Sequence, residues 1–211
     1  MNILVIAPHP DDETIGCGGT LCLHQQRGDR IAIICLTSGE LGLKHLPREK
    51  AWRIREREAR AAARVLGAEP PRFLRQPDWA LGEQIKTAAR ALHPFLLQER
   101  PHLIYVPHEA EWHPDHQAVI PIMRAALRGG RGTEPELRAY EVWTPLAAHD
   151  HAEDITHVMA RKLRALRAYR SQLREFNYVR AVGGLNQFRG ALAAKCPYAE
   201  VFQAVNLNGK P

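Results

Sequence analysis

Short runs of branched apolar residues alternate along this chain with longer segments of helical period, and this alternation strongly constrains the fold. The apolar runs cover residues 3–7, 31–36, 73–74, 103–106 and 140–143, which we predict to be strands. Helices are expected between them, near residues 14–27, 50–66, 83–99, 115–128 and 157–173. Parallel neighbours need crossover connections, which are right-handed. The chain is therefore predicted to adopt an α/β fold, a Rossmann-like, mostly parallel sheet with strand order near 3-2-1-4-5 and helices on both faces.

Length and composition predict one domain spanning residues 1–211, because 45% of the 211 residues are hydrophobic and no linker or repeat interrupts them. The segment 129–136 has the composition of a surface loop. No run approaches the roughly 18 apolar residues of a membrane helix, and the N-terminal segment lacks secretory features. The four cysteines form no C-x-x-C pair. We therefore expect a cytoplasmic protein with reduced thiols and no membrane partner.

The formal charge of +6, from 29 Lys and Arg against 23 Asp and Glu, raises the question of an acidic partner such as nucleic acid. The arginines are spread along predicted helices and interleaved with glutamates, as in residues 53–64, instead of clustering with aromatic residues. This pattern is typical of a solvated helix face. No nucleic-acid partner is predicted.

Two polar clusters follow the first and fourth predicted strands. Residues 8–13 have the sequence PHPDDE, and residues 113–116 have the sequence HPDH. In a 3-2-1-4-5 order these strands are neighbours, so both clusters meet at the carboxyl edge, where such sheets bind ligands. Two histidines and a carboxylate match the three protein ligands of a catalytic zinc ion. Either cluster alone could be a proline-punctuated loop with incidental histidines, but their pairing favours a metal site.

These clusters and several other segments resemble the LmbE/PIG-L-like N-acetylglucosaminyl deacetylases, which include the deacetylases of mycothiol and bacillithiol synthesis. The two paired motifs are highly specific, and the other matches are supportive. The supporting residues are Gly16, Gly18, Gly19, Thr37 to Glu40, Arg55, Glu58, Ala62, Leu66, Gly67, Lys162, Tyr169, Ser171, Gln172, Phe188 to Gly190, and Tyr198 to Glu200.

The resemblance implies a zinc-dependent hydrolase that removes an N-acetyl group from an N-acetylglucosamine-type conjugate, with one Zn²⁺ per chain. His9, Asp12 and His116 match the zinc ligands. Asp11 matches the general base that acts on a metal-activated water. His113 matches the histidine that faces the developing oxyanion, and Asp115 matches the carboxylate that orients this histidine.

Three further residues, Arg55, Asp78 and Glu40, are predicted to bind substrate. Arg55 lies on a helix stripe that should face the core, where the alternative is a snorkelling side chain or an i,i+3 pair with Glu58. Asp78 resembles an aspartate that contacts sugar hydroxyls. In the family a glycine commonly follows this aspartate, whereas Trp79 follows it here, which leaves the pocket shape open.

Another departure precedes the second motif, where Glu111 stands in place of a tyrosine found in some family members. A tyrosine contribution to the oxyanion is then absent or comes from elsewhere. The adjacent Trp112 has two interpretations, stacking on a sugar ring or ordinary packing.

Two alternatives concern the activity itself. The glycines at 16, 18 and 19 suggest a dinucleotide-binding protein, but the G-x-G-x-x-G fingerprint needs glycine where Leu21 stands, and nearby carboxylates would repel phosphate. A metal-dependent hydrolase of a different amide or ester is the stronger alternative. The expected partner is a small amino-sugar substrate whose aglycone the sequence does not name. Because relatives often form trimers or hexamers, a homo-oligomer remains open.

Overall fold

A computed structural model describes residues 1–128 and 135–207, and within them seven strands form a sheet in the order β3-β2-β1-β4-β5-β7-β6. β1 pairs in parallel with β2 and β4, and Ile3 lies opposite both Ile31 and Leu103. The strands are β1 (Asn2–Ala7), β2 (Arg30–Thr37), β3 (Arg72–Gln76), β4 (Leu103–Pro107), β5 (Glu136–Tyr140), β6 (His151–Asp154) and β7 (Ala199–Ala204). The predicted order 3-2-1-4-5 is therefore confirmed for the parallel part of the sheet.

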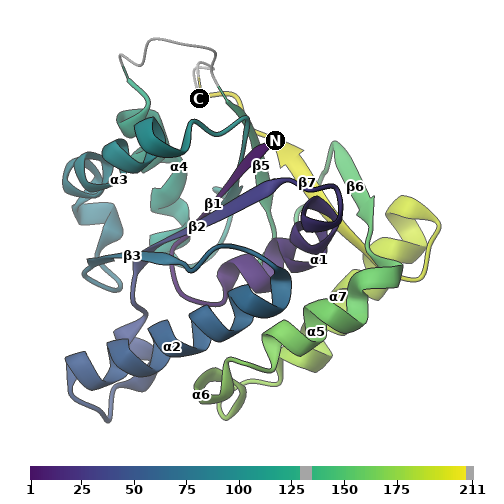
Figure 1. The fold of residues 1–211 in the computed structure, drawn as a ribbon, viewed down its shortest axis with the longest axis horizontal. Coiled ribbons are helices and arrows are strands. Elements are labelled where there is room, and N and C mark those ends of the chain that lie inside the picture. Colours follow the sequence, from purple (N-terminus) through teal and green to yellow (C-terminus); the bar gives the residue numbers. More distant parts are fainter. Residues whose placement is uncertain (129–134, 208–211) are drawn as a thin grey trace.

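Helices cover both faces of the sheet (Figure 1). The α-helices are α1 (Asp12–Gln26), α2 (Arg48–Leu66), α3 (Ile85–Glu99), α4 (Pro114–Ala126), α5 (Met159–Leu166), α6 (Arg170–Leu173) and α7 (Tyr178–Arg189). Short 3-10 turns lie at Glu40–Leu43, Leu81–Glu83 and Thr156–Val158, and a π turn follows α7 at Gly190–Ala194. None of the helices in the described ranges is long and apolar enough to cross a bilayer.

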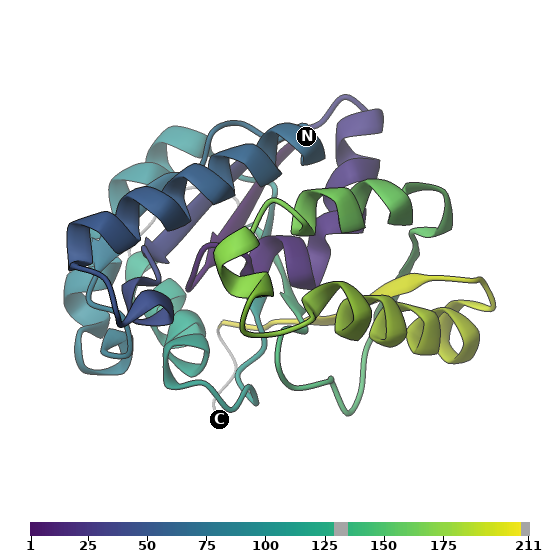
Figure 2. The ribbon, with the colours of Figure 1, turned by 90° about the horizontal axis from the view of Figure 1, so that it is seen from below.

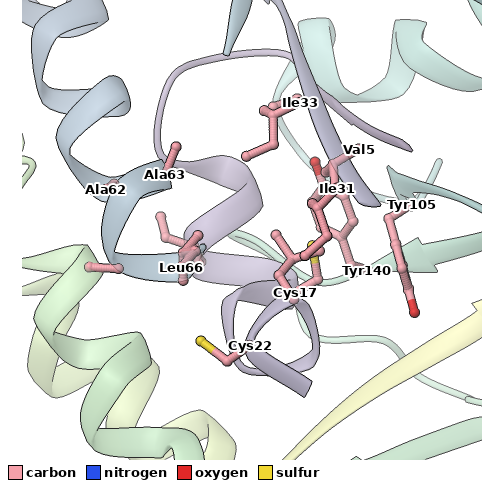
Figure 3. Packing of buried hydrophobic residues seen from close by; sticks show 14 of the residues in the cluster. Val5, Cys17, Cys22, Ile31, Ile33, Ala62, Ala63, Leu66, Tyr105 and Tyr140 are labelled. Atoms are coloured by element: carbon pink, nitrogen blue, oxygen red, sulfur yellow. The ribbon is translucent and has the colours of Figure 1, made fainter. Parts of the chain in front are cut away.

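Alternate residues of the central strands enter two separate cores. Ile3, Val5 and Ala7 pack with α1, α2, α5 and α7, whereas Leu4 and Ile6 pack with α3 and α4. The first of these cores is drawn in Figure 3, where Val5, Ile31 and Leu66 lie in one cluster. This arrangement explains the unbroken apolar runs in the sequence, because a strand covered on both faces needs apolar residues at every position.

The prediction for the strand at 140–143 is wrong in position, because β5 ends at Tyr140. The backbone N–H groups of residues 142, 143 and 144 donate to the buried carboxylate of Glu111 instead of to a neighbouring strand. The apolar residues of this segment therefore reflect side-chain packing and do not indicate pairing in the sheet. The predicted loop at 129–136 lies mostly outside the described residues.

The C-terminal third differs most from the prediction. The helix expected at 157–173 is divided into a 3-10 turn, α5 and α6, with Tyr169 between the two helices. Strands β6 and β7 and helix α7 were not predicted. β7 pairs antiparallel with β5 and β6. An antiparallel strand needs no crossover helix, so the alternation of strands and helices in the sequence does not predict β7, which lies between β5 and β6.

A buried ion pair enters the middle of α1 from the C-terminal region. Lys162 Nζ donates to Glu200 Oε1 at 2.7 Å and to the Ile15 carbonyl at 2.7 Å. Glu200 in turn accepts the backbone N–H groups of Gly19 and Thr20 at 2.8 and 2.7 Å. Side chains that enter a helical hydrogen-bond ladder bend the helix, and α1, drawn in purple in Figure 2, is bent.

Candidate metal centre

The two polar clusters meet at the carboxyl edge of the sheet. His9 and Asp12 follow β1, and His116 lies in the first turn of α4, which follows β4 after a loop. Because β1 and β4 are parallel neighbours, their carboxyl ends lie side by side. All three side chains are buried, and their ligand atoms form a group that could hold a metal ion.

The spacing within this group fits a tetrahedral ion. His9 Nδ1 lies 3.2 Å from Asp12 Oδ2 and 3.3 Å from His116 Nε2. The third edge, from His116 Nε2 to Asp12 Oδ2, is 3.4 Å. Ligand atoms bound about 2.0–2.1 Å from a tetrahedral zinc ion are about 3.3–3.4 Å apart. The three residues therefore match the donor set and the edge lengths of a zinc site.

His9 is oriented by carboxylates behind its ring. Its Nε2 donates to Asp115 Oδ2 at 3.1 Å, and Asp78 Oδ1 lies at the same distance. A proton held on Nε2 leaves the Nδ1 lone pair directed at Asp12 and His116, the arrangement that metal-binding histidines use. Burial alone would lower the pKa of His9, but the nearby carboxylates of Asp115, Asp12 and Asp78 raise it well above its usual value, so a metal ion that binds Nδ1 would release a proton there.

Asp11 lies between the ligands in sequence and has a strained backbone, with φ 126°. Its N–H donates to Glu13 Oε2 at 3.2 Å, and the other oxygen of Glu13 accepts the hydroxyl of Tyr169 at 2.5 Å. Burial raises the pKa of Asp11 to about 7, although the nearby charge of Arg55 opposes the rise. Strained residues that are fixed by their surroundings are typical of functional sites.

Arg55 is buried with 3% exposure, and its guanidinium points to Asp11. Nη1 and Nη2 both lie 3.4 Å from Asp11 Oδ2, and Nη2 donates to the Pro10 carbonyl at 2.7 Å. The alternative i,i+3 pair is not formed, because Glu58 accepts hydrogen bonds from the N–H and hydroxyl of Ser171. The polar residue on the core-facing stripe is thus explained by a partner within the protein.

His113 forms the N-cap of α4, where its Nδ1 accepts the backbone N–H of Asp115 at 3.2 Å. The resemblance implies that the carboxylate of Asp115 orients His113, but this carboxylate accepts from His9 and from the N–H groups of Trp79 and Leu81. Asp115 therefore orients His113 through its backbone. Burial, together with the charges of His9 and His116, lowers the pKa of His113 to about 4.

The two remaining predicted residues, Glu40 and Asp78, border a cavity of about 360 Å³ with Lys44 and Arg48 in its lining. Glu40 accepts from Arg48 Nε at 3.1 Å and from the indole N–H of Trp52 at 3.0 Å. Asp78 Oδ2 accepts the Leu41 N–H, whereas Oδ1 is buried without a well-aligned hydrogen bond in the described part of the chain. Asp78 thus borders both His9 and this cavity.

Sequence reasoning missed two residues near the centre. Glu111 Oε2 lies 3.8 Å from His116 Nδ1, so a carboxylate stands behind the second histidine as well. Tyr178, on α7, is buried, and its pKa is raised by burial and by the negative charges of Asp11 and Asp12. The polar residues that precede the HPDH motif could have indicated Glu111. No local sequence pattern indicates Tyr178.

The glycines of α1 serve close packing. A Cβ on Gly16 would overlap the ring of Tyr140, and one on Gly19 would lie 2.7 Å from Ile155 Cγ2. Asp12 and Glu13 occupy the first turn of the same helix, where a bound phosphate would have to sit. These contacts account for the glycines without a dinucleotide.

The chain thus combines a mostly parallel α/β sheet with a candidate three-residue metal site at the carboxyl edge of that sheet. A profile of the PIG-L family, described as GlcNAc-PI de-N-acetylase, matches residues 4–127. The chain belongs to the PIG-L family.

The chain is also similar in sequence or structure to several known proteins. A probable N-acetyl-alpha-D-glucosaminyl L-malate deacetylase 2 of Bacillus anthracis is 31% identical over 188 residues, covering 81% of this chain and 81% of that protein. The conserved protein TT1542 of Thermus thermophilus is similar in structure, with TM-score 0.80 and 32% identity over 100% of this chain and 97% of that one. The N,N'-diacetylchitobiose deacetylase of Pyrococcus horikoshii shares the fold, with TM-score 0.85 and 24% identity over 97% and 84% of the two chains.

Proposed function

We propose that this protein is a zinc-dependent deacetylase that hydrolyses the N-acetyl amide of an N-acetylglucosamine-type conjugate. The observation that supports this most is the triangle of His9 Nδ1, Asp12 Oδ2 and His116 Nε2, with edges of 3.2, 3.3 and 3.4 Å. Membership of the PIG-L family supports the reaction class. One Zn²⁺ per chain, held by these three residues, completes the proposal.

A bound Zn²⁺ would supply Lewis-acid polarisation of the amide carbonyl and would acidify a water molecule. Asp11 is the general base in this proposal, and a raised pKa suits a carboxylate that must accept a proton near neutral pH. Its role is to take a proton from the attacking water and deliver it to the departing amine. The fixed backbone of Asp11 limits the directions in which its carboxylate can point.

His113 faces the developing oxyanion in the proposed reaction. Its Nδ1 accepts a backbone N–H, so the proton of the neutral ring lies on Nε2. A neutral Nε2–H can donate a hydrogen bond to negative charge that develops on the acetyl oxygen. We therefore infer electrostatic stabilisation by a neutral histidine, without proton transfer from it.

The three residues predicted to bind substrate, Asp78, Glu40 and Arg55, have different roles in this proposal. Asp78 borders the cavity, and its buried Oδ1 lies 3.1 Å from His9 Nε2, so Asp78 would link a bound sugar to the candidate metal ligand. Glu40 borders the same cavity but already accepts two hydrogen bonds, which makes it a wall of the pocket. Arg55 acts mainly on Asp11, because both terminal nitrogens of its guanidinium lie 3.4 Å from Oδ2.

The test is acetate release by metal-stripped protein reconstituted with Zn²⁺, using methyl N-acetylglucosaminide, N,N'-diacetylchitobiose and N-acetylglucosaminyl malate. We expect one equivalent of acetate per amine formed with at least one substrate. Asp11→Asn is the matched control, since it removes the base and leaves the three proposed ligands in place. Hydrolysis of other amides or esters, with none of these sugars, would favour the alternative of a different substrate class.

A further inference from the structure

Four aromatic side chains continue outward from His113, and we call them the aromatic rim: Trp79, Trp112, Trp143 and Phe176. Trp79 and Trp112 lie 4.4 and 5.4 Å from the His113 ring, measured between ring centroids. Trp112 lies 6.0 Å from Trp143, which lies 5.6 Å from Phe176. The rim therefore begins at the candidate metal centre and forms an unbroken series of ring contacts.

Three of the four side chains of the rim are about half exposed, which is unusual for Trp and Phe. Trp79 is 49% exposed, Trp112 55% and Phe176 54%, and only Phe188 among the other described Trp and Phe side chains is exposed to this degree. Single apolar residues scattered over a surface need no explanation. A contiguous group of large aromatic side chains beside a candidate active site is typical of a binding surface.

The backbone of Trp79 gives a second, independent reason to assign a function. Its φ is +66°, a left-handed conformation that bulky L-residues rarely adopt and that glycine adopts freely. The strained backbone is held by the N–H of Trp79, which donates to Asp115 Oδ2 at 2.8 Å. A large aromatic ring is therefore present at a position where the backbone favours glycine, and packing cannot be its full purpose because half of it is exposed.

The other part of the rim is fixed by hydrogen bonds to the main chain. Glu111, which is fully buried, accepts the backbone N–H of Trp143 at 3.0 Å, and the neighbouring N–H groups also point to it. The N–H of Trp112 donates to the hydroxyl of Thr144 at 3.2 Å. Rings fixed before binding lose little conformational entropy when a ligand arrives.

The charges around the rim select the kind of ligand. In the described ranges, Arg side chains stack on the rings of Trp52, Phe73, Phe95 and Phe188, but on none of the four rim rings. The cations Lys44 and Arg48 line the cavity beside Asp78, which no rim residue lines. That cavity also holds the carboxylates of Glu40 and Asp78, so its two positive charges are balanced. The side chains of the rim are uncharged and offer ring faces and edges.

We propose that the aromatic rim binds the aglycone of the substrate, and that this aglycone presents an uncharged, flat apolar face. An aryl group and the apolar face of a second pyranose ring share this chemistry. The inference rests on the proposed function, because it assumes that the reacting amide lies at the candidate metal centre. Trp79 and Trp112, which lie next to His113, would determine specificity without taking part in the bond cleavage.

The experiment compares phenyl and methyl β-D-glucosaminides, which have no acetyl group and so bind without turnover. We expect the Zn²⁺-loaded wild-type protein to bind the phenyl glycoside about tenfold more tightly by calorimetry, which corresponds to about 1.4 kcal/mol. Trp79→Gly should remove most of this preference while leaving the melting temperature equal or higher, since glycine relieves the strained φ. Trp112→Ala tests the neighbouring ring without changing that backbone. Chitobiose, compared with the phenyl glycoside, distinguishes a pyranose from an aryl ligand.

Phe188→Ala is the matched control, because Phe188 is 54% exposed and lies outside the rim; its phenyl-to-methyl ratio should equal that of the wild type. Equal binding of the two glycosides by the wild type, or a preference that survives both Trp79→Gly and Trp112→Ala, would overturn the inference. Stronger binding of glucosaminyl malate than of the phenyl glycoside would overturn it too. Acetate release from the matching N-acetyl compounds is measured separately, so a binding preference without acetate release refutes the proposed function alone.

Discussion

Glu200→Gln should destabilise the protein far more than its small change in size suggests. Glu200 Oε1 accepts from Lys162 Nζ and from the Gly19 N–H, while Oε2 accepts from the Thr20 N–H. An amide in this place retains one acceptor oxygen and turns an N–H donor toward a backbone N–H or the ammonium. The ammonium of Lys162, whose side chain has 0% exposure, is then left without a counterion.

Removing one partner of a buried ion pair costs about 3–5 kcal/mol. For a chain of this length each kcal/mol lowers the melting temperature by roughly 2–4 °C, so the loss should be about 6–20 °C. Chemical denaturation and thermal melting of the same preparation measure both quantities. The double variant with Lys162→Met should lose less than the sum of the two single variants, with a coupling energy above about 1 kcal/mol.

Glu69→Gln is the matched control, because it makes the same chemical change in an ion pair whose two side chains are each 42% exposed. Exposed pairs contribute about 0–1 kcal/mol, so its melting temperature should change little. Similar losses for Glu200→Gln and Glu69→Gln, or strict additivity of Glu200→Gln with Lys162→Met, would refute the assignment of a coupled buried pair that fixes the bend of α1.

The remaining predictions concern the candidate centre. Purified protein should contain close to one divalent metal per chain by elemental analysis, and His116→Ala should lose most of this metal. Full retention of metal by His116→Ala would refute the proposed ligand set. Asp11→Asn should keep the metal while kcat falls by roughly 10²–10⁴, whereas Asp12→Asn should lose metal. Equal loss of metal in both variants would show that the roles of general base and metal ligand are wrongly assigned to these two carboxylates. Arg55→Met should lower kcat with little change in KM if Arg55 positions Asp11, and a raised KM at constant kcat would assign it to substrate instead.

Much of the fold was predictable because its determinants are local. Strands covered on both faces need continuous apolar runs, and helices need the 3.6-residue period, so the sequence around β1, β2 and β4 specifies the parallel centre of the sheet. The failures at β5, β6 and β7 involve contacts with distant residues. The N–H groups of residues 142 and 143 donate to the carboxylate of Glu111, and β7 pairs antiparallel between β5 and β6. Local periodicity does not indicate such partners.

From the sequence alone we could predict which residues form the candidate centre, because two short motifs follow strands that are neighbours in the predicted strand order. The direction of each side chain follows from the packing of the whole chain. This packing directs Nδ1 of His9 toward Asp12, turns Arg55 onto Asp11, and fixes Trp79 at a φ of +66° beside His113. The physical reason is that contacts such as that between Arg55 and Asp11 join residues 44 positions apart, and their geometry depends on how the helices pack against the sheet.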